Sequence, residues 1–282
     1  MAGPDTTHAL VLARGLGTRM QRADAGAALT DAQRRAADAG LKALMPIAGR
    51  PFLDYVLASL ADAGLGRVGL VVAPDHASIA AHYAAHPPVR VTLDFVVQAE
   101  ALGTANAVLA AESWTAGHPF LVMNGDNLYP VRALADLAAL DEPGLPAFDA
   151  ADLVRSSNIP EARIRAFALI DIDEQGYLTG IVEKPSSSES APSAFRRNDV
   201  PRGPNRGVSM NCWRFDARIF DACRDVPRSG RGEYELPEAV GLAVRRGMRI
   251  RAIPAAGPVL DLSRRADAAD VERRLAGVEP RP

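Results

Sequence analysis

Cysteine and a surplus of either charge sign are what this sequence of 282 residues most clearly lacks. Its two cysteines, Cys212 and Cys223, are too few for a disulfide framework or a zinc site. Both lie in apolar stretches, so we expect small core residues. Lys plus Arg number 32 and Asp plus Glu 34, for a formal net charge of −2. A general nucleic-acid binder needs a positive surplus, so no nucleic-acid partner is expected, although a local cationic pocket is compatible with this balance.

Long hydrophobic runs are also missing. The first apolar run, residues 9–13, is too short for the core of a signal peptide, and no run approaches the length of a membrane span. No membrane partner is therefore expected, and the cytoplasm is the default location. Hydrophobic residues still make up 48% of the chain, which is enough for a sizeable core. We expect a single domain over residues 1–282.

The first half of the chain alternates short apolar runs with helical patterns. Strands are predicted at 8–13, 67–73, 91–97 and 119–123, and helices at 52–63, 76–86 and 104–112. Such alternation predicts a parallel sheet with helices on both faces. Ligands of such sheets lie beyond the carboxyl ends of the strands, where the polar residues Gly15–Arg19, Gln98–Thr104 and Asp126 follow.

The second half is less regular. A hairpin of residues 165–171 and 177–182 is predicted around 173–176, and residues 186–206 are typical of a flexible surface loop. Strands at 208–215 and 248–253 and helices at 236–245 and 267–275 complete the prediction. The fold class that follows is α/β, a Rossmann-like three-layer αβα arrangement around a mixed, mostly parallel sheet.

A glycine-rich loop follows the first predicted strand. It runs Ala13-Arg-Gly15-Leu-Gly17-Thr18-Arg19-Met20. Glycines let the backbone approach phosphates, and an arginine offers a planar, permanently charged fork to their oxygens. Met20 occupies the third glycine position of the dinucleotide fingerprint, and no Gly-Lys-Ser/Thr ends the loop, so neither that fingerprint nor a Walker A loop is present. The alternative is a tight turn with a solvated arginine.

Further short motifs follow along the chain. They are a lysine, Lys42, then Pro46, Gly49-Arg50-Pro51, Gln98-x4-Gly103-Thr104-Ala105, Gly125-Asp126 and Glu183-Lys184-Pro185. With the glycine loop, and in this order, they resemble the motifs of the sugar-phosphate nucleotidyltransferase family, the nucleoside-diphosphate-sugar pyrophosphorylases. The resemblance runs from residue 8 to about residue 216, which is most of the chain.

This resemblance implies an enzyme with the fold of nucleotide-diphospho-sugar transferases. It would transfer a nucleotidyl group from a nucleoside triphosphate to a sugar 1-phosphate and release pyrophosphate, with Mg²⁺ as cofactor. The pattern around Gln98 and Gly103 fits UTP or dTTP better than GTP, and nothing names the sugar. A homodimer is left open.

The family's roles map onto matching positions. The resemblance assigns the triphosphate to Arg19 and Lys42, with Ala13, Gly15, Gly17 and Thr18 also at the nucleotide. It assigns the base to Gln98, Gly103 and Thr104, and the sugar phosphate to Glu183, Lys184 and Asn211. It assigns Mg²⁺ to Asp126 and Asp261. Arg19, Lys42, Asp126 and Lys184 would be the catalytic set.

The chemistry that the resemblance implies needs positively charged groups more than it needs a general base that removes a proton. The attacking phosphate is ionised near neutrality, since its second pKa is about 6, so the obstacle is bringing two polyanions together. Magnesium favours one or two carboxylates plus substrate phosphates. The alternatives are surface lysines at 42 and 184, capping roles for Asp126 and Asp261, and a strand-end polar residue at Gln98.

Several positions depart from the family pattern. Arg14 stands where a small residue is usual, and it is either an extra phosphate ligand or points away. Phe167-Ala168-Leu169 stands where a glycine often meets the sugar. Between Arg19 and Lys42 lie 22 residues, more than usual. We interpret 21–41 as an inserted helical lid, with a capping box at Thr30–Gln33 and Gly40 at its end. Arg34 and Arg35 could close over the triphosphate; a solvated helix is the alternative.

Two other functions remain open. A glycosyltransferase using a ready-made nucleotide sugar would need an Asp-x-Asp metal pair, and Asp171-Ile-Asp173 has that spelling. It lies in a predicted hairpin turn, where aspartates are common. A non-catalytic binding or regulatory subunit would have no need to keep Arg19, Lys42, Asp126 and Lys184 together.

Overall fold

One large sheet organises the molecule. The computed structural model describes residues 6–15, 17–22, 24, 26–182 and 206–282. Ten strands in this part form the sheet in the order β10-β9-β11-β8-β12-β6-β1-β4-β5, and β13 also pairs with β8. They are β1 (His8–Leu12), β4 (Arg67–Val72), β5 (Thr92–Val97), β6 (Phe120–Asn124), β8 (Gly144–Phe148), β9 (Ala168–Ile172), β10 (Leu178–Val182), β11 (Arg206–Ser209), β12 (Trp213–Phe215) and β13 (Arg251–Ala255).

The direction of the strands changes across the sheet. The strands of the first half, β1, β4, β5 and β6, pair in parallel. Beyond β6 the sheet continues with the antiparallel strand β12, and β9 pairs antiparallel with β10 on one side and with β11 on the other. The sheet is mixed, as expected, because helices connect the first strands whereas a short turn connects β9 to β10.

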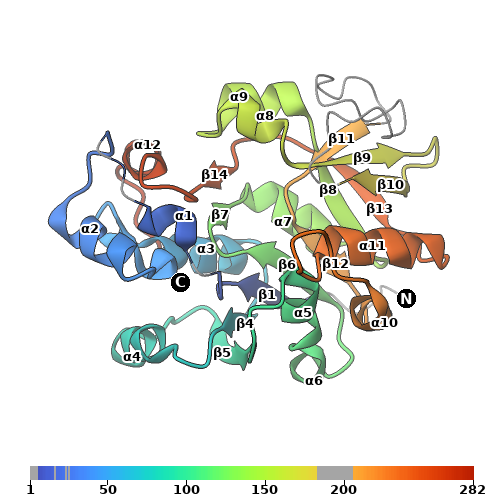
Figure 1. Ribbon diagram of the computed structural model, residues 1–282, viewed down its shortest axis with the longest axis horizontal. Helices are drawn as coiled ribbons and strands as arrows, with labels where there is room; N and C mark the ends of the chain where they lie inside the picture. Colours follow the sequence, from blue (N-terminus) through green and yellow to red (C-terminus); the bar gives the residue numbers. More distant parts are fainter. Residues whose placement is uncertain (1–5, 16, 23, 25, 183–205) are drawn as a thin grey trace.

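Helices cover both faces of this sheet. They are α1 (Thr18–Gln21), α2 (Asp31–Asp38), the 3₁₀ turn η1 (Lys42–Leu44), α3 (Phe52–Asp62), α4 (Ala77–Ala85), α5 (Thr104–Leu109), α6 (Glu112–Thr115), α7 (Val131–Ala138), α8 (Ala150–Ser156), α9 (Glu161–Ile164), α10 (Ile219–Asp225), α11 (Leu236–Arg245) and α12 (Asp267–Arg274). In Figure 1, α1, α2 and α12 gather at one end of the molecule and β9 and β10 lie at the other. The expected fold class is confirmed.

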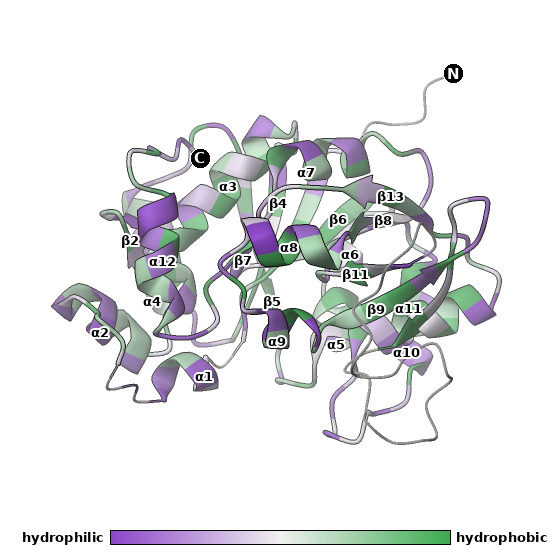
Figure 2. Cartoon of the chain, turned by 90° about the horizontal axis from the view of Figure 1, so that it is seen from above, coloured by the Kyte–Doolittle hydropathy of each residue, from purple (hydrophilic) through white to green (hydrophobic). Residues whose placement is uncertain are grey.

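The alternation of side chains along β1 separates two hydrophobic cores. Ala9 and Val11 join the core under α3, α7 and α12, whereas Leu10 joins the core under α5, α10 and α11. Because β1 is buried on both faces, its sequence is an unbroken apolar run. Hydrophobic residues dominate the central strands, and hydrophilic residues interrupt α2, α8 and α12 (Figure 2).

Two very short sheets lie outside the large one. Strands β2 (Pro46–Ile47) and β3 (Arg50–Pro51) form a tight hairpin before α3. Strands β7 (Asn127–Leu128) and β14 (Leu260–Asp261) pair antiparallel, with Asp261 opposite Asn127. The second pairing joins the segment after β6 to the C-terminal region.

Several predicted boundaries are wrong. The strand predicted at 208–215 is two strands, because Asn211 has a φ of 57° and interrupts the extended backbone between β11 and β12. The helix predicted at 104–112 ends at Leu109, and α6 follows after a short break. The hairpin starts at Ala168, not at residue 165, because α9 and a turn precede it. The strand predicted at 248–253 is β13, shifted toward the C-terminus.

Other expectations on the fold are confirmed or lie outside the described residues. Cys212 and Cys223 are buried free thiols, as expected, and burial raises the pKa of Cys223 to about 12. The capping box predicted for 30–33 is present at the start of α2. Most of the loop predicted at 186–206 falls outside the described part of the chain. No helix within the described ranges has the length and apolarity that crossing a membrane requires.

Phe120 anchors the core beneath α10. It is fully buried on β6, its ring stacks on Phe220 at 5.5 Å, and it lies 6.3 Å from the ring of Phe215. Replacing Phe120 with alanine should lower the free energy of unfolding by about 3–5 kcal/mol, because transfer free energy is lost and a cavity is left. Urea denaturation measures this change. Val89→Ala is the control, since Val89 is 87% exposed, and its effect should stay within about 0.5 kcal/mol.

Candidate active site

A cavity of about 620 Å³ lies beyond the carboxyl ends of the central strands. Side chains from both halves of the chain line it, and they include Arg19, Thr104, Asn124, Arg163, Phe167, Ser209, Asn211, Arg231, Asp261, Ser263 and Arg264. Four of the lining residues are arginines and three, Glu233, Glu235 and Asp261, are acidic, so the cavity holds charges of both signs. Arginine side chains at its wall can bind phosphate oxygens.

Lys42 and Asp126 form an ion pair beside this cavity. Asp126 follows β6, Lys42 begins η1, and the Lys42 Nζ contacts Asp126 Oδ2. About one-fifth of each side chain is exposed, so ligands can reach both groups. Two residues that the sequence assigned to one reaction are therefore in contact, although 84 positions separate them.

Asp261 lies next to Asp126 and is almost completely buried. The backbone N–H of Leu262 donates to the carbonyl of Asp126 at 2.9 Å, and the β7–β14 pairing places Asp261 opposite Asn127. The Ser263 Oγ lies 2.5 Å from Asp261 Oδ1 and 3.5 Å from Asp126 Oδ2, so the hydroxyl lies between the two carboxylates and its one proton can be donated to Asp261. Burial, and then the nearby charge of Asp126, raise the pKa of Asp261 to about 6.

Arg163 balances the charge of Asp261. Its Nη1 donates to Asp261 Oδ2 at 2.6 Å, and its two terminal nitrogens reach both oxygens of Asp267, at 3.0 and 2.6 Å. The side chains of all three residues are at most 14% exposed. Asp267 also accepts the backbone N–H groups of Ser263 and Arg264. Arg163 therefore fixes the loop that carries Asp261, a role for which the sequence offered no signal.

The two aspartates fit the ligand set that magnesium prefers. Within the described part of the chain no group of three or more His, Cys, Asp or Glu side chains could hold a metal ion. Magnesium is held by one or two carboxylates and completes its shell with water and substrate phosphates. Asp126 and Asp261 would supply these carboxylates.

The glycine loop is placed by its neighbours in the sheet. The N–H of Ala13 donates to the carbonyl of Val71 at 3.0 Å, so the loop leaves β1 in register with β4. Gly17 has a φ of 61° and precedes α1, and a Cβ there would lie 3.2 Å from the carbonyl oxygen of Gly40. Thr18 and Arg19 are exposed, and Arg19 lines the cavity, as expected of a phosphate ligand.

Arg265 ties this loop to the segment that follows Asp261. It is 8% exposed, and its guanidinium donates to the carbonyls of Met20 at 2.7 Å and Gln21 at 3.1 Å. It also contacts the carboxylate of Asp38 at the end of α2. Because these carbonyls end α1, one arginine stabilises both α1 and the end of the insert. This residue was not recognised in the sequence.

Gln98 and Gly103 lie together, but the amide nitrogen of Gln98 is used within the protein. Gln98 is 3% exposed, and its Nε2 donates to the carbonyl of Gly103 at 3.0 Å and to Asn106 Oδ1 at 2.8 Å. Thr104 lines the cavity, and its hydroxyl accepts the N–H of Leu236 at 2.8 Å. Gln98 thus shapes the segment around Gly103. A direct contact of Gln98 or Gly103 with a base stays a prediction.

Arg14 joins the glycine loop to the Gln98 segment. Its Nε donates to the carbonyl of Gln98 at 2.7 Å and its Nη2 to the carbonyl of Ala99 at 3.1 Å. The sequence left open whether Arg14 is a phosphate ligand or points elsewhere. In the structure the guanidinium binds backbone carbonyls and holds two ligand-facing loops at a fixed separation.

The sugar-phosphate side is described only in part. Asn211 and Phe167 line the cavity, whereas Glu183 and Lys184 lie outside the described residues. Phe167 is half-buried at the position where the pattern led us to expect a glycine. Arg231, from the Ser229–Gly232 segment, also lines the cavity and pairs with Glu235. Arg231 lies between two glycines in the sequence, and this signal was missed.

Helix α2 of the insert is docked against other parts of the chain. Gln33 is buried in α2, and its Nε2 donates to the carbonyl of Pro46 at 3.0 Å and to Glu272 at 3.1 Å. Arg34 and Arg35 are exposed and are absent from the lining of the cavity. The lid role of residues 21–41 therefore stays a prediction, and these contacts describe a packed helix.

The Asp-x-Asp spelling lies away from the cavity. Asp171, on β9, pairs with Arg206 at 3.2 Å. Asp173 Oδ1 accepts the N–H groups of Gln175 and Tyr177 and so shapes the β9–β10 turn. These are turn and ladder contacts of a hairpin, and neither aspartate lines the cavity.

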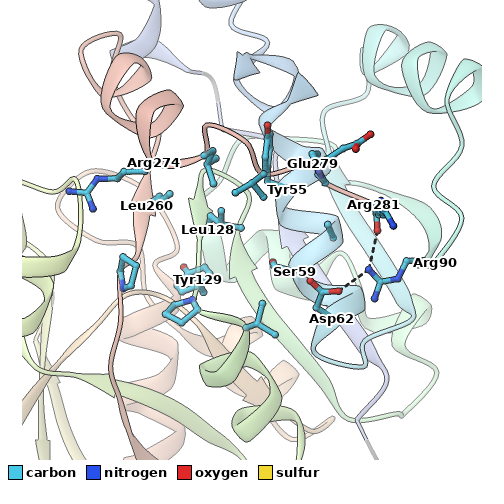
Figure 3. A pocket seen from close by; sticks show the side chains of 17 residues that line it. Tyr55, Ser59, Asp62, Arg90, Leu128, Tyr129, Leu260, Arg274, Glu279 and Arg281 are labelled. Atoms are coloured by element: carbon cyan, nitrogen blue, oxygen red, sulfur yellow. Dashed lines mark hydrogen bonds and ion pairs between the residues drawn. The ribbon is translucent and has the colours of Figure 1, made fainter. Parts of the chain in front are cut away.

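A second cavity, also of about 620 Å³, lies on the other side of the β7–β14 pair (Figure 3). Leu128 and Leu260 line it, whereas their neighbours Asn127 and Asp261 face the first site. Asp62 and Arg90 form an ion pair of 2.8 Å at its rim. None of the residues assigned from the sequence lines this second cavity, so the first is the candidate active site.

Comparisons with known proteins show the family of this chain. A family model described as nucleotidyl transferase matches residues 26–258. The UTP–glucose-1-phosphate uridylyltransferase AglF of Haloferax volcanii is 29% identical, over 95% of this chain and 96% of that protein. A glucose-1-phosphate thymidylyltransferase of Streptomyces antibioticus is 28% identical, over 97% of this chain and 67% of that protein.

Solved structures share the fold. A UDP-glucose pyrophosphorylase complexed with UDP-glucose superposes with a TM-score of 0.69 at 17% identity, over 97% of this chain and all of that chain. The inositol-1-phosphate CTP transferase of T. maritima superposes with a TM-score of 0.68 at 16% identity, over 98% of both chains. At these identities the likeness concerns the architecture.

Arg163 offers a test of the charge balance around Asp261. Arg163→Met keeps most of the apolar stem but leaves Asp261 and Asp267 without their buried cation. The free energy of unfolding should fall by about 3–5 kcal/mol, as for other broken buried pairs. Arg155→Met is the matched control, since Arg155 is 68% exposed and pairs with Asp152 on the surface, and about 1 kcal/mol or less is expected. Equal losses in guanidinium denaturation would contradict the assignment.

Gly103 offers a test of the base-side loop. A Cβ at Gly103 would lie 2.5 Å from the carbonyl oxygen of Tyr234, and its φ is 105°. Gly64 has a φ of 86° with nothing within 4 Å of the same atom, so Gly64→Ala measures backbone strain alone. Gly103→Ala should destabilise the protein by about 1–3 kcal/mol more than Gly64→Ala, because the added methyl overpacks the site. Thermal denaturation of both variants under the same conditions measures this difference in stability.

Proposed function

The chain belongs to the sugar-phosphate nucleotidyltransferase family, and from that premise we propose that its first cavity joins a nucleoside triphosphate to a sugar 1-phosphate. The observation that carries the proposal is the convergence of Arg19, the Lys42–Asp126 pair and Asp261 at one mouth of the sheet. Each comes from a different segment, and each was assigned to the same reaction. If these assignments were wrong, we would expect the residues to lie on separate surfaces.

The reaction needs charge neutralisation and alignment. An oxygen of the sugar phosphate forms a bond to the α-phosphorus, the bond from that phosphorus to the bridging oxygen breaks, and pyrophosphate leaves with the electron pair. Arg19 and Lys42 would hold the triphosphate and reduce the repulsion between the two anions. Asp126 and Asp261 would hold Mg²⁺, which when bound supplies further positive charge to the phosphates.

The lysine content of the sequence supports these roles. Lys42 and Lys184 are the only lysines in the chain, which otherwise uses arginine for positive charge. A surface lysine exchanges readily with arginine, whereas a compact ammonium group on a flexible stem is not replaced by a planar fork at a tight contact. The surface-lysine alternative therefore loses support at both positions.

The nucleotide is proposed to be UTP or dTTP and not GTP. The sequence pattern at Gln98 and at Gly103-Thr104-Ala105 favoured these two. The names of the relatives above, a uridylyltransferase and a thymidylyltransferase that act on glucose 1-phosphate, support the same choice. Glucose 1-phosphate is accordingly the first acceptor to test.

A matrix of UTP, dTTP and GTP against sugar 1-phosphates, read by pyrophosphate release, tests the function. We expect turnover with UTP or dTTP and magnesium, and a loss in kcat/KM on the order of 10²–10³ in Lys42→Ala, by analogy with other charge-stabilising donors. Arg132→Ala is the control, because Arg132 is 87% exposed and pairs only with Asp136 one turn away. Absence of pyrophosphate from every pair, with a folded protein, would reject the proposal.

The two lysines also allow a test without turnover. Reductive methylation with ¹³C-formaldehyde labels lysine side chains and the chain's amino terminus, so Lys42 and Lys184 should give two lysine signals, assigned with Lys42→Ala. UTP with magnesium should shift the Lys42 signal, and glucose 1-phosphate the Lys184 signal. Signals that respond to neither ligand would contradict the assigned roles.

A further inference from the structure

Three asparagines connect a core tryptophan to the buried carboxylate of Asp261. Trp213 Nε1 donates to Asn211 Oδ1 at 3.0 Å, and Asn211 Nδ2 donates to Asn124 Oδ1 at 2.6 Å. Asn124 Nδ2 donates to Asn127 Oδ1 at 3.2 Å, and Asn127 Nδ2 donates to Asp261 Oδ1 at 3.3 Å. We call Asn211, Asn124 and Asn127 the asparagine chain.

Both ends of the asparagine chain have a fixed polarity. An indole N–H can only donate, and an ionised carboxylate can only accept, whereas each amide offers one oxygen and one NH₂ group. The three amides therefore have a single arrangement in which every contact joins a donor to an acceptor. Turning any one of them by 180° would bring two oxygens or two NH₂ groups together, which is unfavourable, most of all at the buried Asn127.

Trp213 is a firm anchor for this arrangement. It is fully buried on β12, and its ring stacks on Phe215 at 5.8 Å. Asn211 has a φ of 57°, in the left-handed region that asparagine tolerates better than most residues, and this conformation places its side chain between Trp213 and Asn124. The break between β11 and β12 therefore allows the side chain of Asn211 to contact both Trp213 and Asn124.

The asparagine chain decides which oxygen of Asp261 is available. Among the described residues three side-chain hydrogen bonds reach this carboxylate: Asn127 and Ser263 at Oδ1, and Arg163 at Oδ2. A carboxylate offers about four acceptor positions, so the position left over is on Oδ2. A reversed Asn127 would turn its oxygen toward Oδ1 and push the carboxylate away.

We propose that Trp213 is a positioning residue for Asp261, acting through Asn211, Asn124 and Asn127 to orient the carboxylate for a divalent cation. The proposal rests on Asp261 as a metal ligand in the proposed function. Outer partners of metal-binding side chains set the orientation of those side chains and change metal affinity when they are removed. Here the outermost partner lies in the hydrophobic core, four hydrogen bonds from the carboxylate.

Mn²⁺ binding to the whole protein, read from the electron paramagnetic resonance signal of free Mn²⁺, tests the proposal without turnover. Trp213→Phe removes one N–H and keeps an aromatic ring in the core. We expect Mn²⁺ to bind about 2- to 10-fold more weakly, the range that corresponds to one net hydrogen bond. Trp114→Phe is the matched control, because its indole donates at 2.9 Å to Asp94, which does not line the cavity, and its Mn²⁺ affinity should be unchanged.

A double-mutant comparison separates positioning from loose packing. Asn127→Ala should weaken Mn²⁺ binding about 10-fold or more, because it removes the partner that touches Asp261. If Trp213 acts through the asparagine chain, adding Trp213→Phe to Asn127→Ala should weaken binding no further. If the two effects multiply, Trp213 acts by another route and the proposal is overturned.

A second variant covers the case in which Trp213→Phe does not fold. Asn211→Gly suits the positive φ and cuts Trp213 off from Asn124, so it should fold and weaken Mn²⁺ binding as Trp213→Phe does. Unchanged Mn²⁺ affinity in Asn211→Gly, or no Mn²⁺ binding by the unmodified protein, overturns the proposal. Pyrophosphate release by the unmodified protein reports on the proposed function separately, so the two failures are distinguishable.

Discussion

The antiparallel pairing of β7 with β14 is the constraint on which the site depends. It joins segments 134 positions apart, places Asp261 opposite Asn127 and brings Asp261 beside Asp126. Two neighbouring carboxylates repel each other, and burial strengthens the repulsion. Lys42 on one side and Arg163 on the other offset it, so the pairing and the two ion pairs form one electrostatic unit.

Two arginines to which the motifs assigned no role hold neighbouring loops of the candidate site together. Arg14 binds the carbonyls of Gln98 and Ala99, and Arg265 binds the carbonyls that end α1. A planar guanidinium with five N–H donors can serve two carbonyls at once, which a lysine does less well. Arg14 and Arg265 therefore fix how the loops that carry the motifs lie relative to their neighbours.

The sequence predicted the parallel half of the sheet well because buried parallel strands are unbroken apolar runs followed by polar loops. Residues 9–12 and 68–72 have this pattern, and the loop after the first of these runs carries the glycine motif. The break at Asn211 was missed, since a positive φ at a non-glycine residue leaves no trace in hydrophobicity. The strand β8, with its Gly144 start and Pro146, was missed because neither residue favours strands.

The residues of the candidate site also divide into those with a local sequence pattern and those without one. Arg19, Lys42 and Asp126 were named from short motifs and Asp261 from its place late in the chain, and the structure brings the four to one region. Arg163, Arg265, Asn124 and Asn127 were not named, and Asn211 was named only for the sugar phosphate, because their contacts join segments about 85 to 245 positions apart. Such contacts arise only when the chain is folded, so no local pattern encodes them.

The anchoring of α2 explains how the fold accommodates the long segment of sequence between Arg19 and Lys42. Arg265 holds the carbonyls just after Arg19 and the carboxylate of Asp38 just before Lys42, so both ends of the intervening segment are attached to the same side chain. With its ends fixed, each doubling of such a segment adds only about 0.6 kcal/mol of closure entropy. This part of the fold can therefore tolerate large variation in length between homologous chains while the two cations keep their places.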